Sequence, residues 1–447
     1  MKALSLDADA HLRPPYGSGV EVLRGHQFAE LNRVLMEARE HNPFYQEKLA
    51  GVKLPLQRWE DLAQVPFTTK AELVDDQQRF PPFGRNHYLP EHEYVQYHQT
   101  SGTKGKPLKV LDTPESWAWW RDCWVEVLQT AGVTREDRVF LAFSFGPFIG
   151  FWAAYAAAEA IGALVIPGGG QTSLERLRLI LEMRATVLLC TPSYALHLAE
   201  VAAENGLDLK SSAVRVLIHA GEPGASIPSV RDQIDTLWNA RCYDHSGMTE
   251  MGAYAYACQL RRGLHVNERQ FFAEIIDPVS GDAVPPGQTG ELVLTNFGRR
   301  GYPLIRYRTG DIVVAADQPC PCGRPFRFLP GGVVGRSDDM VVIRGVNIFP
   351  QSIEAIVREF SDVREFRIVY YTEEQMPQIK VQVEADTQTV GILGRRLREG
   401  IGLRIDVEPV EPGSLPRFEM KARRVLDLRP QTQVAASGPL APQDGTD

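Results

Sequence analysis

One turn of the chain combines glycines, hydroxyl side chains and lysines: Ser101-Gly102-Thr103-Lys104-Gly105-Lys106-Pro107. Glycine lets backbone N–H groups approach phosphate oxygens, hydroxyls donate further hydrogen bonds, and lysine adds positive charge. The turn is not a Walker A loop, because two residues rather than four separate Gly102 from Gly105. By composition alone, a surface turn explains this segment as well as a phosphate-binding loop does.

Two further segments place a carboxylate beside hydroxyl groups or glycine. The first, YDHSGMTE, ends in Thr249 and Glu250, a pair that suits Mg²⁺ beside phosphates. The second ends in Thr309-Gly310-Asp311, where an aspartate at a strand end can accept hydrogen bonds from two ribose hydroxyls. Taken singly, a capped helix start and an ordinary turn are the simpler explanations of these two patterns.

Cysteine and histidine form two closely spaced pairs. Six residues separate Cys258 from His265, and one residue separates Cys320 from Cys322. Four such ligands suit a structural, tetrahedral Zn²⁺ site, although spacing alone fits free thiols equally well. The other three cysteines lie in apolar contexts and are expected to be core residues: Cys123, Cys190 and Cys242.

The elements that must position these residues are expected to be strands alternating with helices. VFLAFS, ALVIPGG, TVLLCTPS and VRVLIHAGE, between Val139 and Glu222, are short and apolar and run into Gly, Pro or Ser. Helices are expected between them, for example from Leu174 to Arg184 and from Tyr194 to Asn205. Such alternation favours a parallel sheet covered by helices, with ligands at the carboxyl ends of the strands.

After Tyr254 the pattern becomes β-rich, with FFAEIIDP, GELVLTNF and IVVAAD separated by turn sequences. Beyond Gly335, helical and strand patterns indicate a small α+β unit. The predicted fold class is therefore α/β, with a large N-terminal domain of several subdomains over 1–335. This domain holds the parallel sheet and the β-rich subdomain, and a linker at 336–339 leads to a small α+β C-terminal domain over 340–429. The tail, 430–447, has almost no large apolar residue and is expected to be disordered.

Composition and charge exclude several classes of protein. The 447 residues include 48 Lys and Arg and 56 Asp and Glu, a net charge of −8, which argues against a nucleic-acid or anionic-membrane binder. Six cysteines are too few for a disulfide scaffold. The uncharged stretch from Val139 to Ala158 is interrupted by Gly146, Pro147 and Gly150, so a strand, a loop and a buried helix fit better than a membrane span. With no evident signal peptide, we expect a cytoplasmic protein with reduced thiols.

In this order along the chain, the segments resemble the adenylate-forming superfamily, and in particular the phenylacetate–CoA ligase family. The matching motifs are SGTKGKP, HAGEPGASIP, YDHSGMTE, PLIRYRTGD, GRSDDMVVIRGVNIFP and PRFEMKARRV, and they span roughly Val34 to Leu428. The resemblance implies a two-step reaction. ATP and a carboxylate form an acyl-adenylate and pyrophosphate, the mobile small domain rotates, and a thiol, usually that of CoA, displaces AMP.

The resemblance also implies roles for single residues. Pyrophosphate would be held by Ser101, Gly102, Thr103, Gly105 and Lys106. Adenine would meet Gly221, Glu222 and Pro223, with Asp244 near its exocyclic amine. Thr249 and Glu250 would support the phosphates and Mg²⁺, and Asp311 would bind the ribose with Arg336 close by.

Two further residues would act in catalysis itself. Lys421 would bridge the acyl carboxylate and the α-phosphate during adenylation only, and Asp338 would be the hinge between the two states. The chain departs from the family pattern at Lys104, usually Thr, at Ser246, where a tyrosine commonly stacks on adenine, and at Met420, usually Gly. None of these departures removes a charged catalytic group.

The acid-binding pocket implied by the resemblance is rich in bulky side chains: Phe143, Phe145, Phe148, Ile149, Trp152, His219 and Ala220. A small aromatic acid would fit this lining, although core packing explains each side chain equally well. We therefore expect an ATP-dependent acid–CoA ligase that uses ATP, Mg²⁺ and CoA. Some relatives have a matching Cys/His cluster, so a structural Zn²⁺ is also expected, and the family is compatible with a homodimer. The alternatives are transfer of the acyl group to an amine or to a carrier-protein thiol in trans, and a nucleotide-binding relative without catalysis.

Overall fold

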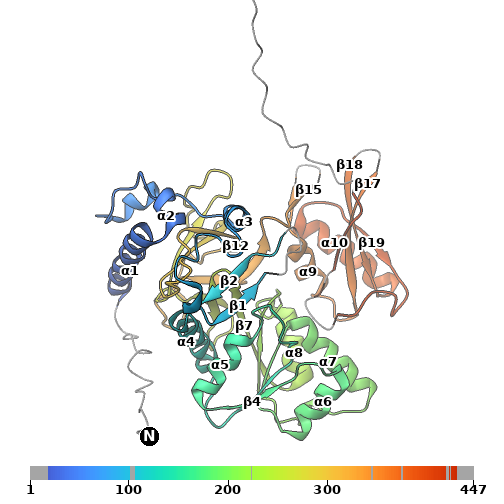
Figure 1. The fold of residues 1–447 in the computed structure, drawn as a ribbon. Helices are drawn as coiled ribbons and strands as arrows, with labels where there is room; N and C mark the ends of the chain where they lie inside the picture. The colour runs from blue at the N-terminus through green and yellow to red at the C-terminus, as the bar shows by residue number, and fades with distance from the viewer. Residues whose placement is uncertain are drawn as a thin grey trace, which may run out of the picture. The chain divides into compact units, whose positions relative to one another are not determined.

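The computed structural model of the chain describes residues 19–100, 106–222, 224–343, 346–373, 376–418, 422 and 424–429 (Figure 1). The chain divides into two compact units. The large unit comprises Met1–Met340, Phe349–Glu359 and Pro416–Ala422, and the small unit comprises Val341–Ile348, Phe360–Leu415 and Arg423–Asp447. The boundary between the units is therefore not a single position in the chain, since two segments after Met340 group with the large unit. The predicted tail, 430–447, lies outside the described residues.

The centre of the large unit is an eight-stranded sheet, and five of its strands are parallel. Strand β3 lies between β4 and β5, followed by β6 and β7. The bounds are β3 (Arg138–Leu141), β4 (Leu164–Pro167), β5 (Val187–Cys190), β6 (Val216–His219) and β7 (Arg241–Met248). The parallel sheet predicted from the alternating pattern is thus confirmed.

Helices cover both faces of the parallel strands, because successive side chains of a strand point to opposite faces. On one face, Leu188, Leu217 and Cys242 belong to a buried cluster with side chains of three helices. These helices are α6 (Ser173–Glu182), α7 (Pro192–Glu204) and α8 (Pro228–Trp238) (Figure 1). On the other face, Ile218 and Tyr243 belong to a second cluster with α4 (Pro114–Thr130) and α5 (Trp152–Ile161).

Beyond β7 the same sheet becomes antiparallel, in the order β7, β8, β9 and β13. The bounds are β8 (Gly252–Ala257), β9 (Gly263–Val266) and β13 (Phe328–Pro330). A separate antiparallel sheet forms the β-rich part in the order β10, β11, β12 and β14. Its bounds are β10 (Phe271–Ile276), β11 (Thr289–Asn296), β12 (Tyr307–Val314) and β14 (Val333–Arg336). The predicted β-rich subdomain is confirmed.

The N-terminal part is mostly helical. The helices expected between Gln27 and Leu49 are α1 (Val20–His41) and α2 (Pro43–Lys48), and Asn42 separates them by accepting hydrogen bonds from the Phe44 and Tyr45 backbones. Helix α3 (Lys70–Arg79) follows a capping box between Thr69 and Glu72. Short elements complete this part: η1 (Trp59–Gln64), η2 (Glu91–Glu93), β1 (Gln96–Gln99) and β2 (Lys109–Asp112), with η3 (Leu209–Ser211) later in the chain.

The small unit contains a four-stranded sheet in the order β19, β18, β17 and β20, and a hairpin of β15 and β16. The bounds are β15 (Val341–Ile343), β16 (Val346–Ile348), β17 (Phe366–Glu373), β18 (Met376–Val383), β19 (Asp406–Pro409) and β20 (Val425–Asp427). Helix α10 (Thr387–Ile401) begins at Asp386, whose side chain accepts from Thr389 N, and ends at Gly402. Helix α9 (Pro350–Val357) groups with the large unit.

The uncharged stretch from Val139 is resolved into strand β3, a loop and helix α5, as its glycines and proline predicted. Among the described residues, no helix is both long enough and apolar enough to cross a membrane.

Candidate active site

The predicted nucleotide residues lie where parallel strands end, on β7 and in the segment after β6. Asp244 lies on β7, 8% exposed, and accepts hydrogen bonds from the Ser226 hydroxyl and, at 3.0 Å, from the His245 backbone N–H. Burial raises the pKa of this carboxyl to about 6, although both hydrogen bonds oppose the rise. Asp244 is therefore a buried acceptor that is held in place and is suited to an exocyclic amine.

Asp311 is the centre of a second cluster, on β12. Tyr254 donates its hydroxyl to Oδ2 and Arg336 donates Nη1 to Oδ1, both at 2.6 Å. The register of the sheet sets this pair, because Asp311 lies opposite Arg336 on β14. The Ser246 hydroxyl lies 2.7 Å from that of Tyr254, which links β7 to the cluster. Sequence reasoning predicted Arg336 beside Asp311 and did not identify Tyr254.

Arg336 also pairs with Asp338, the predicted hinge residue, at 3.0 Å. Burial disfavours the charge of Arg336, yet the carboxylates of Asp311 and Asp338 together raise the pKa of its guanidinium. One arginine thus joins the predicted ribose residue and the predicted hinge residue in a single ion-pair network.

Glu250 follows β7 and is 5% exposed. Lys70, the first residue of α3, places Nζ 2.9 Å from Glu250 Oε1, and the Tyr307 hydroxyl lies 3.4 Å from the same oxygen. The sequence analysis missed Lys70. Its only sequence signal was the position after the capping residue Thr69, where the first turn of a helix begins.

Arg299 fixes the backbone of the same turn. Its Nη1 donates to the carbonyls of Thr249 at 2.8 Å and Glu250 at 2.7 Å, while Nε and Nη2 each donate to Asp112 at 2.6 Å. Both side chains of this bidentate ion pair are fully buried. Arg299 therefore positions the Glu250 carboxylate without contacting it, and nothing in the motif pattern identified it.

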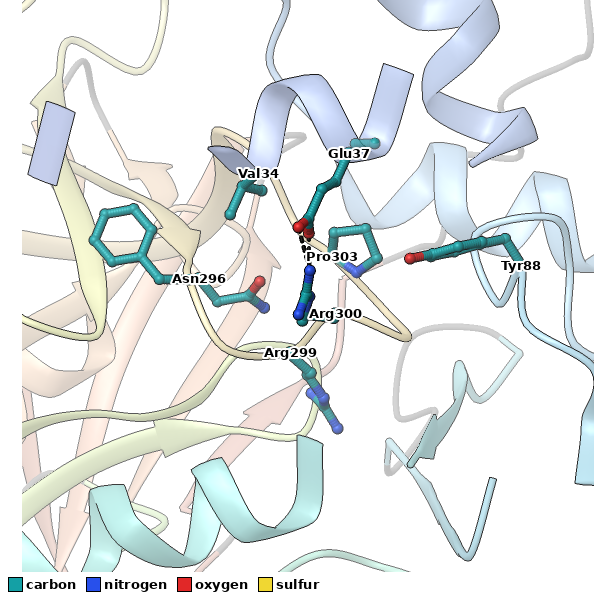
Figure 2. Close-up of a pocket in the computed structure, with 9 residues that line it drawn as sticks. Val34, Glu37, Tyr88, Asn296, Arg299, Arg300 and Pro303 are labelled. Atoms are coloured by element: carbon teal, nitrogen blue, oxygen red, sulfur yellow. Dashed lines mark hydrogen bonds and ion pairs between the residues drawn. The ribbon is translucent and has the colours of Figure 1, made fainter. Parts of the chain in front are cut away.

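Figure 2 shows a small pocket on another side of Arg299, and none of the predicted site residues lines it. Arg300 and Glu37 form an ion pair at its edge, with Nε of the arginine 3.1 Å from the carboxylate. The free volume of about 10 Å³ suits a single water molecule. This pocket is too small for an acyl group or a nucleotide.

The predicted acid-binding loop after β3 is a cluster of aromatic rings. Phe145 lies 5.4 Å from Phe143 and 4.9 Å from Trp152, between ring centroids. Gly150 lets the loop close over Phe143, since a Cβ at this position would come within 1.8 Å of that ring. Phe148 and Trp152 are more than a third exposed, so the cluster borders open space.

The remaining predicted acid-binding residues divide between the two faces of the sheet. Ile149 and Ala220 pack against the same buried cluster as Phe143 and Phe145. His219 is fully buried, and its Nδ1 lies 3.1 Å from the carbonyl oxygen of Cys190, a residue of the opposite cluster. Burial lowers the pKa of His219 to about 4. The structure therefore does not bring His219 together with the ring cluster.

Glu222 lies just after β6 and accepts hydrogen bonds from both the backbone and the hydroxyl of Ser193. Its second oxygen accepts from the backbone N–H of Ala422 at 3.0 Å, within the large unit. Six predicted residues lie outside the described part of the chain: Ser101, Gly102, Thr103, Gly105, Pro223 and Lys421. Lys106 is described and is exposed.

The predicted metal ligands lie together, although Cys320 follows His265 by 55 positions in the sequence. The ligand atoms of Cys258, His265, Cys320 and Cys322 all lie within 4.8 Å of one another. The Sγ atoms of Cys258 and Cys320 are 3.9 Å apart, and Cys322 Sγ is 3.4 Å from His265 Nε2. Three thiols and one imidazole at these distances match the donor set of a closed tetrahedral Zn²⁺ site.

Two family models match the chain. The model described as "AMP-binding enzyme" matches residues 36–298, and the model described as "AMP-binding enzyme C-terminal domain" matches 345–429. Curated relatives include phenylacetate–coenzyme A ligase of Pseudomonas putida, which is 33% identical over 95% of this chain and 98% of its own. The enzyme of the same name from Thermus thermophilus is 31% identical over 92% of this chain and 97% of its own.

A solved structure of 2-hydroxyisobutyryl-CoA ligase in the postadenylation state, with an acyl-AMP bound, is also similar. It superposes with a TM-score of 0.84 at 32% identity and covers 90% of this chain and 88% of the other.

Proposed function

The chain belongs to the phenylacetate–CoA ligase family of AMP-binding enzymes, and we propose that within this chemistry it activates a small aromatic carboxylic acid. It is an ATP-dependent, AMP-forming acid–CoA ligase. The observation that supports the ATP-dependent chemistry is the placement of three buried carboxylates on or next to β7 and on β12, each held by a named partner. Asp244 is held by Ser226, Glu250 by Lys70, and Asp311 by Tyr254 and Arg336.

In the first step a carboxylate oxygen of the acid attacks the α-phosphorus of ATP, and pyrophosphate leaves. Asp311 would accept the ribose hydroxyls while Tyr254 and Arg336 hold its orientation, and Asp244 would accept from the adenine amine. Such fixed acceptors orient the α-phosphate before reaction, which lowers the entropic part of the barrier. Lys421 would offset the repulsion between the acyl carboxylate and the α-phosphate.

Mg²⁺ is expected at Glu250. The residue fits, because a hard cation takes carboxylate oxygens and Glu250 is 5% exposed with Oε1 fixed by Lys70. When bound, the ion would supply neutralising charge to the phosphates. Arg299 would keep the Glu250 backbone in position for this role through its two carbonyl contacts.

In the second step the CoA thiol attacks the acyl carbon and AMP leaves, giving the thioester. We propose that Asp338 serves as the hinge between the two steps. Its ion pair with Arg336, itself bound to Asp311, supports this role because it connects the nucleotide residues to the linker. We further propose a structural Zn²⁺ at Cys258, His265, Cys320 and Cys322, and a cytoplasmic location. We also expect that the chain can form a homodimer, and that a carrier protein acting in trans is an alternative acceptor.

The rings of Phe143, Phe145 and Trp152 favour an aromatic acid, since flat rings pack well against edge-to-face aromatic clusters. The named substrates of the relatives support a small acid of either kind. Phenylacetate is aromatic, and 2-hydroxyisobutyrate is short and carries a hydroxyl group.

The test is ATP–pyrophosphate exchange with a panel of aryl and short aliphatic acids, repeated with CoA and thioester detection. Exchange with an aryl acid followed by thioester formation is the expected result. Exchange without a thioester would indicate an amine or carrier-protein acceptor. Preference for aliphatic acids alone would reject the aromatic assignment, and ATP binding without any exchange would reject the enzyme.

A further inference from the structure

Strand β7 carries a second buried polar side chain beside Asp244. His245 is 6% exposed and lies between Asp244 and Ser246, both of which belong to the nucleotide site described above. Neither Nδ1 nor Nε2 of its ring has a hydrogen-bond partner among the residues that the structure describes. An imidazole so close to the reaction site, with both nitrogens unpaired, is a candidate for contact with a ligand.

The missing partners carry a cost. Burial lowers the pKa of His245 to about 3, so the ring is neutral and offers one N–H donor and one acceptor. A buried polar group without a partner costs on the order of 1–3 kcal/mol. An apolar side chain at this position would avoid that cost, so the histidine fits a role that a bound molecule completes.

The His245 side chain lies on the same face of the sheet as the acid-binding rings. Cys242 on the same strand belongs to the cluster under α6, α7 and α8, and Tyr243 to the cluster under α4 and α5. By strand alternation His245 shares the face of Tyr243. Its ring centroid is 4.0 Å from that of Trp124 on α4, which confirms this placement.

A series of rings leads from His245 to the acid-binding loop. Trp124 lies 6.0 Å from Phe151, and Phe151 lies 5.8 Å from Phe143, between centroids. Phe143, Phe145 and Ala220 pack against this same cluster. His245 is thus a polar side chain on the sheet face that carries the acid-binding rings, and the buried rings of Trp124 and Phe151 connect it to Phe143.

We propose that His245 determines substrate specificity by hydrogen bonding to a hydroxyl group on the acid, so that the preferred substrate is a small hydroxylated carboxylic acid. A hydroxyl both donates and accepts, so it pairs with either tautomer of a neutral imidazole. Burial is the cause of the lowered pKa of His245, so a neutral, hydrogen-bonding group such as a hydroxyl suits this side chain better than a charged substituent. This inference rests on the proposed function as an acid–CoA ligase and specifies a hydroxyl group on its substrate.

The experiment compares acids in matched pairs, by adenylation kcat/KM and by calorimetric binding in the presence of a non-hydrolysable ATP analogue. One pair is phenylacetate with 4-hydroxyphenylacetate, and the other is 2-methylpropanoate with 2-hydroxy-2-methylpropanoate. We expect the enzyme to prefer the hydroxylated member of one pair by about 10-fold or more. This is the effect of giving a partner to one buried hydrogen-bonding group that otherwise has none. The pair that shows this preference identifies the hydroxyl as one on an aromatic ring or one on an aliphatic chain.

His245→Phe keeps a ring against Trp124 and removes both nitrogens. It should abolish the preference by lowering kcat/KM for the hydroxylated acid about 10- to 100-fold while sparing the parent acid. His245→Gln restores a donor and an acceptor and should recover part of the preference. The matched control is His98→Phe, because His98 is also buried and stacks on a tryptophan, Trp117, at 5.5 Å. It should leave the preference unchanged.

The assignment is wrong if the wild type prefers neither hydroxylated acid, or if His245→Phe lowers kcat/KM equally for all the acids. A failure of the proposed function looks different, because no acid would then support pyrophosphate exchange or thioester formation. In that case the calorimetric binding measurement tests the role of His245. A hydroxyl preference in calorimetry that His245→Phe removes would keep the role of His245, and its absence would reject that role as well.

Discussion

At the scale of single residues, the burial of the Asp244 carboxyl lowers the stability of the folded chain at neutral pH. Burial raises the pKa of its carboxyl from the ordinary 3.8 to about 6. Between these two pH values the unfolded chain releases the proton while the folded chain keeps it. Folded-state stability is therefore lost as pH rises through this window, and the loss is complete above pH 6. At about 1.4 kcal/mol per pKa unit the loss is roughly 3 kcal/mol.

We therefore predict that Asp244→Asn, which removes the charge, raises the free energy of unfolding at pH 7.5 by about 1–3 kcal/mol, with little change at pH 4. The same variant should bind ATP more weakly, because the amide no longer offers two acceptor oxygens to adenine. Urea unfolding at both pH values and ATP titration measure the two effects. An equal gain in stability at pH 4 and pH 7.5 would contradict the assigned cause.

Lys70 is the residue that the structure adds to the site. It lies 2.9 Å from Glu250 and is about half exposed, so it contributes little to stability as an ion pair. Its charge nevertheless holds the carboxylate expected to support phosphate and Mg²⁺. We predict that Lys70→Ala lowers kcat/KM for ATP in the exchange reaction about 10- to 100-fold, with a nearly unchanged melting temperature.

The control for Lys70 is Lys48→Ala. Lys48, the last residue of α2, forms an ion pair with Glu72 of α3, the helix that also carries Lys70, and this pair does not involve Glu250. This variant should keep wild-type exchange kinetics. Equal losses in the two variants would mean that Lys70 acts only by stabilising the helix.

At the scale of elements, the Cys/His cluster depends on strand pairing. His265 lies on β9, which pairs with β8 on one side and with β13 on the other, and Cys258 follows β8 directly. The segment with Cys320 and Cys322 connects β12 to β13. A metal bound here would tie together two strand connections of the large unit, and its binding free energy would add to folding.

We predict that protein purified without chelators contains about one zinc per chain and that Cys322→Ser loses it, with a fall of several degrees in melting temperature. Cys190→Ala is the matched control, because Cys190 is a buried free thiol outside the cluster. It should keep the metal. Zinc-free wild-type protein by elemental analysis would remove the metal assignment.

The elements also show which parts of the fold can be predicted from sequence patterns. The four parallel strands predicted from apolar runs are all present, because buried parallel strands are continuously apolar and bounded by turn residues. The order of the strands and the antiparallel extension through β8, β9 and β13 could not be predicted, since pairing partners leave no local signal. Arg299 and Tyr254 escaped prediction for the same reason. Their roles depend on contacts with residues about 50 positions away.

At the scale of the whole molecule, the two reaction steps make opposite demands on the linker. Adenylation needs the nucleotide residues in place, whereas thioester formation is expected to need rotation about Asp338. The Asp338 carboxylate lies 3.0 Å from Arg336, so a substitution there changes both a side-chain contact and the freedom of the backbone. The two effects can be separated, because proline fixes φ and asparagine does not.

We predict that Asp338→Pro keeps ATP–pyrophosphate exchange within about threefold of wild type and lowers thioester formation from a supplied acyl-adenylate at least 10-fold. Asp338→Asn, which weakens the contact with Arg336 but leaves the backbone free, should retain both steps. Lys421→Ala should show the reverse pattern, with exchange abolished and the thiol step spared, because the proposed role of its charge is confined to the approach of the carboxylate to the α-phosphate. If the proline and alanine variants instead lose both steps together, neither residue separates the two halves of the reaction, and the two-state assignment fails for this chain.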